Sequence, residues 1–213
     1  MVKILEIEQG TPEWHQARKG VVTATKAQSL LELKNNGGFT AKRETAICEL
    51  AMERLGGLGR DPIIGGATLE RGHEQEEDAA IAYEAKTGRR LAKCGFMIHD
   101  EYPQFGCSPD RVVVGEKRLV EIKVPTCIKK MSSYLLEKKH AEEYHFQLIH
   151  QMFVADYDYV DIVAYDNRAP AFLQTAIVEI KRPDSWSSYL SDLMKAEREI
   201  GALMRKFKKL ENS

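Results

Sequence analysis

The sequence contains no apolar run approaching the ~20 residues that a membrane-spanning helix needs. Its first ten residues, MVKILEIEQG, lack the apolar core of a signal peptide. Internal repeats and low-complexity segments are also missing. We therefore expect a soluble, cytosolic protein whose 213 residues form a single domain with a substantial core.

Cysteines are few and scattered, at Cys48, Cys94, Cys107 and Cys127. Zinc sites and disulfide frameworks usually show closer or more regular spacing, so we expect free and mostly packed thiols. A nuclease with an iron–sulfur cluster would need a group of cysteines near the C-terminus, and none follows Cys127.

An excess of positive charge is absent as well. The chain carries 31 Lys and Arg against 32 Asp and Glu, a formal net charge of −1. Proteins that bind nucleic acid often carry a basic field. If this protein binds DNA, it must use a local basic patch or channel.

Helices dominate the first part of the predicted structure. Thr11 and Pro12 are typical of a helix N-cap and first position, and Gly20 of a helix end. Helices are predicted over 12–20, 23–33, 41–55 and 67–86, with a loop over 56–62. The apolar stripe of the last helix is expected at Leu69, Ala80, Ile81 and Tyr83.

Strands follow, predicted over 91–99, 111–114, 119–124, 159–165 and 172–180, with a hairpin around Gly115. Helices over 127–138 and 142–154 separate the third and fourth strands, and a last helix covers 184–208. The order predicts a mixed α/β fold with a central sheet flanked by helices. We expect an N-terminal helical part at about 11–88, a sheet core at about 89–182 and the C-terminal helix.

The most informative segment is Ser108-Pro109-Asp110, followed after ten residues by Glu121-Ile122-Lys123. Alternate residues of a strand share a face, so Glu121 and Lys123 project together while Ile122 points to the packed side. Pairing in the hairpin would bring Asp110 beside them. Two carboxylates and an ammonium would then meet at one place.

Such a cluster suits Mg²⁺, which prefers carboxylate oxygens and keeps several waters. The carbonyl of Ile122 would supply a further oxygen, and Lys123 would hold the attacking water or offset charge in the transition state. The alternative is a solvated strand face with an ordinary ion pair. The apolar residues around Glu121 favour a buried strand instead, and a downstream helix offers amide side chains.

The pattern Asp110…Glu121-Ile122-Lys123 resembles that of the PD-(D/E)xK nuclease superfamily, with its restriction-endonuclease-like core. Over roughly Thr11 to Arg168, four blocks make the chain similar to the phage lambda exonuclease family of viral recombination nucleases.

The first block, Trp14 to Thr25, is similar to a helix and turn in which the family's arginine grips the 5′-phosphate of the degraded strand. The resemblance gives this role to Arg18, with Trp14 and Thr25 beside it. The second block, Glu70 to Ala79, matches a helix that carries a metal-linked glutamate, here Glu76. Without the resemblance, Glu76 would be read as part of a solvated acidic run.

The third block continues the core motif to Lys129, where the family usually has an arginine. A lysine at this position can still contact a phosphate, but it cannot form the bidentate hydrogen bonds of an arginine. The fourth block gives the family's active-site glutamine, which maps onto Gln147, with Gln151 one turn away as the alternative. His145 and His150 are expected to be ordinary helix residues.

The resemblance implies an Mg²⁺-dependent 5′-to-3′ exonuclease on double-stranded DNA, with Mn²⁺ able to substitute. It implies mononucleotide products and a 3′ single-stranded tail for an annealing protein, used in recombination by strand annealing. It also implies a ring-shaped homotrimer, encoded by a phage or prophage and active in the bacterial cytoplasm. Two alternatives stay open: another PD-(D/E)xK endonuclease or junction resolvase, and a catalytically inactive DNA-binding module.

Overall fold

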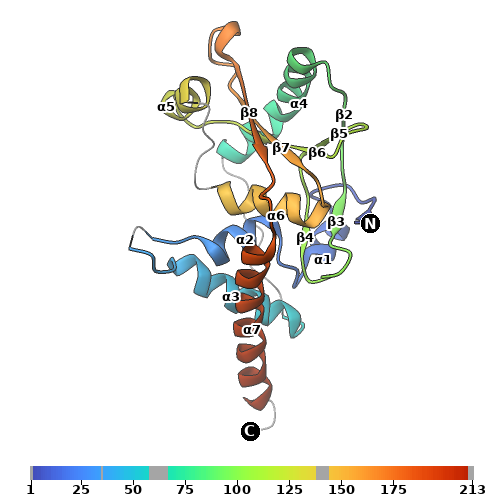
Figure 1. Ribbon diagram of the computed structural model, residues 1–213, viewed down its shortest axis with the longest axis vertical. Coiled ribbons are helices and arrows are strands. Elements are labelled where there is room, and N and C mark those ends of the chain that lie inside the picture. Colours follow the sequence, from blue (N-terminus) through green and yellow to red (C-terminus); the bar gives the residue numbers. More distant parts are fainter. Residues whose placement is uncertain (1, 35, 58–66, 138–143, 211–213) are drawn as a thin grey trace.

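A five-stranded mixed sheet lies at the centre of the computed structural model, which describes residues 2–34, 36–57, 67–137 and 144–210 (Figure 1). Its strands, in spatial order, are β2 (Leu91–Ala92), β5 (Arg111–Val113), β6 (Arg118–Lys123), β7 (Tyr159–Tyr165) and β8 (Thr175–Lys181). β6 and β7 run parallel, and the other neighbours are antiparallel. The predicted mixed α/β fold with a hairpin between β5 and β6 is confirmed.

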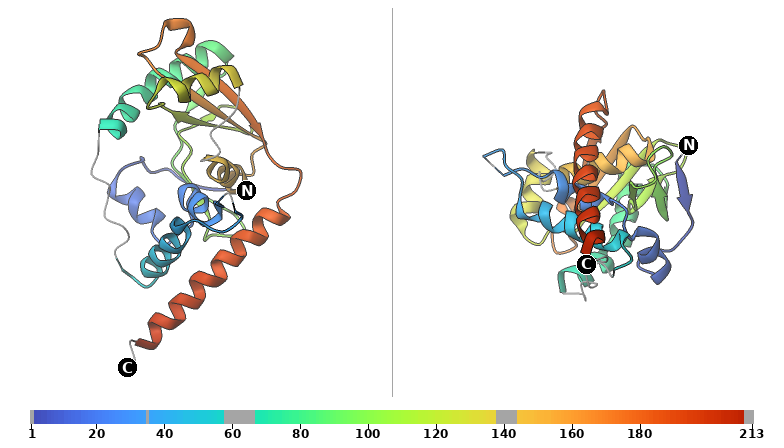
Figure 2. Two further views of the ribbon diagram at one scale, coloured as in Figure 1. Left: turned by 90° about the vertical axis from the view of Figure 1, so that its left-hand side faces the viewer. Right: turned by 90° about the horizontal axis from the view of Figure 1, so that it is seen from below.

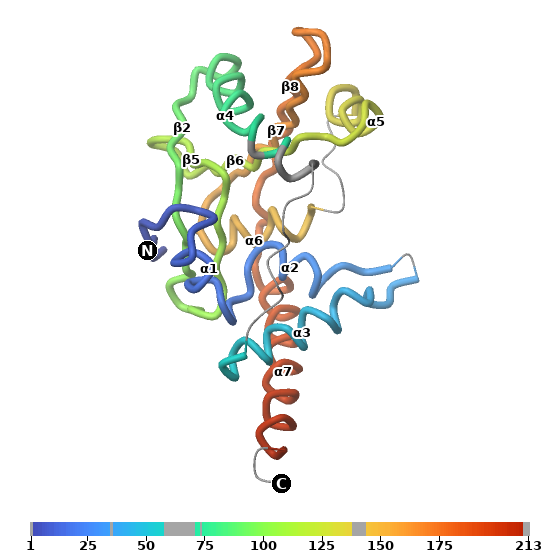
Figure 3. Tube along the Cα trace, turned by 180° about the vertical axis from the view of Figure 1, so that it is seen from behind, coloured from blue at the N-terminus to red at the C-terminus, as the bar shows by residue number. Residues whose placement is uncertain are grey.

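Helices cover both faces of this sheet. α4 (Ala67–Thr87) packs on one face, and α6 (His145–Ala155) packs on the other, so that β6 passes between them (Figure 3). Beneath α6 lie α2 (Ala24–Leu31), α3 (Ala41–Arg54) and the long α7 (Ser187–Leu210), which runs along α3 and past it (Figures 1 and 2). None of the described helices is long and apolar enough to span a bilayer.

The side chains of β6 alternate between two hydrophobic clusters. Val120 and Ile122 pack with Ala79 and Tyr83 of α4, whereas Leu119 belongs to the larger cluster on the α6 side. Because alternate residues of a strand share a face, the residues at 121 and 123 also face α6. The sheet thus presents Glu121 and Lys123 to α6.

The predicted strand over 91–99 is wrong, because the segment divides between two sheets. β2 pairs in the central sheet, while β3 (Phe96–Ile98) joins β1 (Lys3–Leu5) and β4 (Gly106–Cys107) in a small sheet that the sequence did not indicate. The chain changes sheets around Gly95. A Cβ at this position would lie 2.0 Å from the carbonyl oxygen of Leu5, so only glycine permits the close approach.

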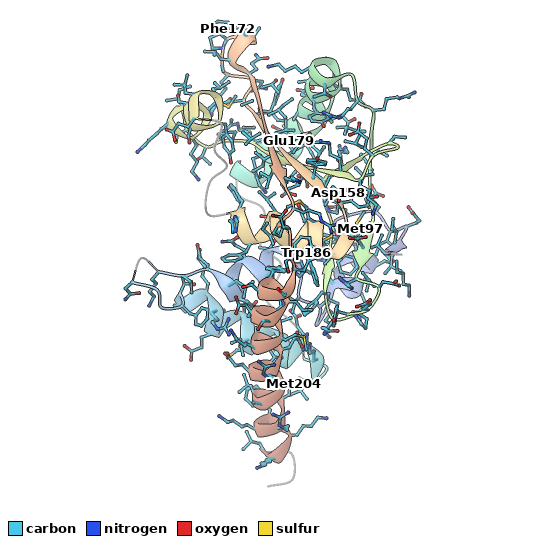
Figure 4. All side chains as sticks on the ribbon, in the orientation of Figure 1. Met97, Asp158, Phe172, Glu179, Trp186 and Met204 are labelled. Atoms are coloured by element: carbon cyan, nitrogen blue, oxygen red, sulfur yellow. The ribbon has the colours of Figure 1, made fainter. Side chains whose placement is uncertain are left out.

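Two other predicted elements have different bounds. The predicted helix over 127–138 consists of α5 (Ile128–Ser132) and a π-helical turn, η1 (Ser133–Glu137). β8 begins three residues later than expected, because a 3₁₀ turn, η3 (Ala171–Leu173), forms first. Figure 4 shows Phe172 of this turn at the tip of the β7–β8 connection, where it is 78% exposed.

Some predicted core residues are on the surface. Ile81 was assigned to the apolar stripe of α4 but is 59% exposed. All four cysteines are free as expected, although Cys48 and Cys127 are exposed rather than packed. The predictions for residues 58–62, for the side chain of Leu69, and for the helix ends at Lys138 and Glu142 concern residues outside the described part of the structure.

His150 is fully buried in α6 and is not arranged as a metal ligand. Its Nδ1 lies 2.7 Å from the hydroxyl of Tyr189, and its Nε2 lies 2.9 Å from the carbonyl oxygen of Val22. Burial lowers the pKa of His150 from 6.5 to about 4. The prediction that this histidine is an ordinary helix residue is confirmed, and it links α6 to α7 and to the segment after α1.

This burial predicts a loss of stability in acid. The folded state keeps His150 neutral down to about pH 4, whereas the unfolded chain takes up the proton below about pH 6.5. Its contribution is therefore fully present above pH 6.5 and falls by up to about 3 kcal/mol towards pH 4. Urea unfolding at pH 7.5 and pH 5 should show a smaller acid loss for His150→Gln than for wild type. The exposed His15→Gln serves as the control, and equal losses in all three proteins would contradict the assignment.

Candidate active site

Glu121 is 3% exposed, and its carboxylate accepts hydrogen bonds on both oxygens. Lys123 Nζ and Gln147 Nε2 each donate to Oε1 at 2.6 Å, and Gln151 Nε2 donates to Oε2 at 2.6 Å. A buried charge is tolerated only when it is paired and hydrogen-bonded in this way. The predicted neighbours Glu121 and Lys123 therefore do meet on one face of β6.

Gln147 and Gln151 both belong to the site. They stand four residues apart on α6 and so share one face of the helix, above Glu121. Both alternatives considered from the sequence are thus in contact with the same carboxylate. The Oε1 atom of Gln151 is buried without a hydrogen-bond partner, so the site contains an acceptor oxygen that has nothing to bind.

Asp110 reaches the same place from the residue before β5. Its Oδ2 accepts a 2.6 Å hydrogen bond from the backbone N–H of Ile122, between Glu121 and Lys123. Burial and the negative charge of Glu121 raise the pKa of Asp110 well above its usual range, while Lys123 and the Ile122 N–H act in the opposite sense. Burial alone would lower the pKa of Lys123, but the two carboxylates outweigh it and raise that pKa.

Glu76 approaches from α4, on the other side of the sheet. Its carboxylate forms an ion pair with Arg111 Nη1, and the same nitrogen donates to the carbonyl oxygen of Asp110 at 2.8 Å. Glu76 is half-buried, unlike the exposed Glu74 and Glu77, so it is not simply part of a solvated run. Its charge also raises the pKa of Asp110, which puts it within electrostatic range of the site.

Two carboxylates facing one ammonium leave an excess of negative charge in a buried place. This donor set, together with the unpartnered oxygen of Gln151, fits a hard divalent cation with oxygen ligands. Within the described residues, no group of three or more His, Cys, Asp or Glu side chains is arranged as a metal site. A cation here would therefore need oxygens other than those two carboxylates, from the backbone or from water.

A second polar site lies at α1 (Pro12–Arg18). The guanidinium of Arg18 stacks on Trp14, with its Cζ 3.8 Å from the ring centroid. Ser108 Oγ accepts from Trp14 Nε1 at 2.9 Å and from Arg18 Nη1 at 3.3 Å. Ser108 stands two residues before Asp110, so this group lies close to the carboxylate site along the chain.

Arg18 is a partly buried cation. Burial lowers its pKa to about 10, which still leaves it charged at neutral pH. No carboxylate of the described residues forms an ion pair with it, whereas the buried Arg111 and Arg118 each have several. A desolvated guanidinium beside a hydroxyl is suited to an anion that comes from outside the chain.

The position of Arg18 depends on the turn that follows it. Thr11 Oγ1 accepts from the N–H of Trp14 and caps α1 as predicted, and Gly20 ends the turn with φ +73°. Glu53 of α3 accepts from the Gly20 N–H at 2.7 Å, and Arg54 Nε donates to the Gly20 carbonyl at 2.7 Å. α3 thus holds both backbone polar groups of Gly20 next to α1.

Other predicted contacts are less closely connected. Thr25 is exposed in the first turn of α2, and no hydrogen bond joins it to Arg18 or Ser108 in the described part of the chain. Lys129 is exposed on α5, and His145 is exposed at the start of α6. Sequence reasoning missed the contacts of Ser108 and Arg111. The only signal for Arg111 was a charged residue at the start of an apolar strand.

Comparisons with known proteins agree with this geometry. The profile of a family described as the YqaJ-like viral recombinase domain matches residues 13–158. The alkaline exonuclease LHK-Exo from Laribacter hongkongensis is 31% identical with a TM-score of 0.77, over 94% of this chain and 100% of that one. Its complex with dAMP gives 32% identity and the same TM-score and coverage.

A phage-related exonuclease from Haemophilus somnus 129PT is 17% identical, with a TM-score of 0.63 over 90% of this chain and 95% of that one. At this identity the similarity shows a shared fold alone. No curated protein sequence matches the chain significantly.

The buried pair of carboxylates predicts that Asp110→Asn stabilises the protein in the absence of divalent metal. Asparagine keeps an acceptor for the Ile122 N–H but removes one negative charge beside Glu121. We expect the melting temperature in EDTA to rise by about 2–8 °C, as for a gain of one to two kcal/mol. Differential scanning calorimetry measures this, with the surface substitution Asp192→Asn as the control. A lower melting temperature for Asp110→Asn would show that its charge is fully compensated.

Proposed function

This chain belongs to the family of YqaJ-like viral recombinase domains, and we propose that it is a divalent-metal-dependent exonuclease that digests duplex DNA from the 5′ end. The match to LHK-Exo confirms the predicted PD-(D/E)xK nuclease fold and the resemblance to viral recombination exonucleases. The observation that carries the proposal is the arrangement beneath α6, where the Ile122 N–H holds Asp110 beside the ion pair of Glu121 with Lys123.

We propose that Asp110, Glu121 and the carbonyl of Ile122 hold Mg²⁺, with Mn²⁺ able to replace it. Glu76 is the further proposed ligand, although its carboxylate is paired with Arg111 in this structure. When bound, such a cation polarises a phosphoryl oxygen and lowers the pKa of a coordinated water. The carboxylate pair supports this assignment because, among the described residues, Lys123 is the one cation whose charge is found to lower the pKa of Asp110.

The chain's own residues then have separate tasks. Lys123 places an ammonium beside the reacting phosphate, where it holds the attacking water and offsets developing charge. Gln147 and Gln151 fix both oxygens of Glu121, so that the carboxylate keeps its orientation throughout the reaction. Water adds to phosphorus, the bond from phosphorus to the 3′ oxygen breaks, and that oxygen takes up a proton.

This bond cleavage leaves a 5′-phosphate on the shortened strand. Each cut therefore regenerates the group that Arg18 is proposed to bind, with Ser108 and Trp14 beside it. Thr25 and Lys129 are proposed as further contacts to the DNA backbone, by resemblance to the family. The released unit is a 5′-mononucleotide, and the dAMP complex of LHK-Exo supports a product of this kind.

The biological setting is part of the proposal. The chain is proposed to act as one domain within a ring-shaped homotrimer, which would enclose DNA without a strongly positive net charge. The 3′ single-stranded tail would pass to an annealing protein during recombination, in a bacterial cell that carries the phage or prophage. The family name and the similarity to exonucleases support recombination as the context.

Digestion of linear duplex labelled at one end tests the proposed activity. With Mg²⁺, label at the 5′ end should be released as mononucleotide well before label at the 3′ end, and closed circular duplex should be resistant. Lys123→Met should slow release by at least about 10²–10³-fold while duplex binding changes little, because the ammonium acts on developing charge. Lys195→Met, on the exposed face of α7, should behave as wild type.

Other outcomes of this digestion experiment would favour a different function or exclude Lys123 from the mechanism. Cutting of the closed circle would favour another PD-(D/E)xK endonuclease or junction resolvase. Binding without any cleavage by wild type would favour a catalytically inactive DNA-binding module. Activity of Lys123→Met within tenfold of wild type would remove Lys123 from the proposed mechanism.

The Arg18 site predicts a selective defect. Arg18→Gln should slow digestion of 5′-phosphorylated duplex by about tenfold or more and leave 5′-hydroxyl duplex almost unchanged, because only the phosphate forms the charge-assisted hydrogen bonds. The measurement is the ratio of the two rates, with the exposed Arg198→Gln as the matched control. Arg18 is not the end-sensing residue if wild type shows no preference, or if the variant keeps it.

A further inference from the structure

The first turn of α6 begins without a cap from its own N-terminal residue. The helix starts at His145, and the side chain of the N-cap residue, Tyr144, makes no capping hydrogen bond. The first N–H groups of an α-helix have no acceptor within the helix, and an N-cap side chain usually accepts from the second or third of them. In α6 these two donors belong to Phe146 and Gln147. Their acceptor has to come from elsewhere in the fold.

That acceptor is the side chain of Gln28 on α2, which lies 118 residues before Phe146 in the chain. Gln28 Oε1 accepts from the N–H of Phe146 at 2.8 Å and from the N–H of Gln147 at 3.2 Å. α2 packs directly against α6 (Figure 3). Ala27 and Leu30, on either side of Gln28, are fully buried in the cluster that the two helices share. One helix therefore caps the other, from a position that the core holds fixed.

Gln147 connects this cap to the active site. Its backbone N–H is held by Gln28, and its side-chain Nε2 donates to Oε1 of Glu121 at 2.6 Å. The same carboxylate oxygen accepts from Lys123 Nζ, also at 2.6 Å. Helix ends fray unless their free N–H groups are satisfied, and Gln147 stands in the first turn. Loss of the cap would therefore loosen Gln147 before it loosened Gln151, one turn further into the helix.

We propose that Gln28 is a positioning residue for cleavage, whose side-chain oxygen caps α6 and thereby fixes Gln147 on Glu121. The proposal rests on the proposed exonuclease function and adds to it a residue of α2 that lies outside every motif noted in the sequence. A displacement of about 1 Å in a catalytic group can cost up to about 100-fold in rate, so a cap at this distance from the reaction has a measurable effect.

Amide hydrogen exchange of the metal-free protein tests the cap without relying on cleavage. In Gln28→Met the amides of Phe146 and Gln147 should exchange at least about tenfold faster than in wild type, because methionine has a similar length but no oxygen. Gln28→Glu keeps an oxygen acceptor, and its charge suits a helix N-terminus, so both amides should stay protected. Ser29→Gly is the matched control, since it weakens α2 at the next position but leaves the Gln28 oxygen in place.

Cleavage kinetics at saturating Mg²⁺ separate positioning from a general loss of stability. Gln28→Met should lower kcat on linear duplex about tenfold and change KM by less than about twofold. Gln28→Glu should restore kcat to within about threefold of wild type, and Ser29→Gly should retain the wild-type value. In a Gln147→Met background, Gln28→Met should have no further effect. In an Arg18→Gln background it should lower kcat by the same factor as in wild type, because the two sites act independently.

The proposal is overturned if Gln28→Met leaves the exchange of both amides unchanged, or if it keeps the wild-type kcat. It is also overturned if Gln28→Glu is as slow as Gln28→Met, or if Gln28→Met lowers kcat equally with and without Gln147. Failure of the proposed function gives a different result. A wild-type protein that shows the cap by exchange but cleaves no DNA would contradict the exonuclease and the kinetic role of Gln28, while the cap itself would stand.

Discussion

The carboxylate of Glu121 is enclosed between β6 and α6, and much of the structure follows from the need to satisfy it. A carboxylate removed from water is costly unless donors replace its hydration. Lys123 supplies one donor from the same strand, and Gln147 and Gln151 supply two from α6. Because both glutamines must face the strand, this requirement fixes the rotation of α6 over the sheet.

The polar contacts of this site also reach α4, on the opposite face of the sheet. The Ile122 N–H holds Asp110, and Arg111, the next residue, reaches back to Glu76 on α4. Helices on opposite faces of the sheet are thus connected through one pair of neighbouring strands. Side chains alternate between the two faces along β6, so Val120 and Ile122 pack against α4 while Glu121 faces α6. This alternation places the apolar contacts on one face of the sheet and the polar site on the other.

Positive charge is local in this protein and is distributed around the carboxylates. Arg18 is partly buried on one side with Trp14 and Ser108, and no carboxylate of the described residues forms an ion pair with it, while Lys123 lies beside Glu121 on β6. A net charge of −1 therefore does not prevent contact with a polyanion. The desolvated positions matter more than the total, because charges removed from water interact more strongly with an incoming phosphate.

The sequence by itself determined the strand pair, the hairpin and the meeting of Glu121 with Lys123, because these depend on a period of two and on short turns. It also determined the cap of α1 and the boundaries of β7. Only the tertiary structure decided that both glutamines contact Glu121, that Ser108 joins Arg18, and that the segment around Gly95 passes between two sheets. Those contacts join residues far apart in the chain, so they depend on how helices and sheets pack, and no local pattern encodes them. The fully buried His150 and the exposed Ile81 illustrate the same limit, since burial is a property of the assembled fold.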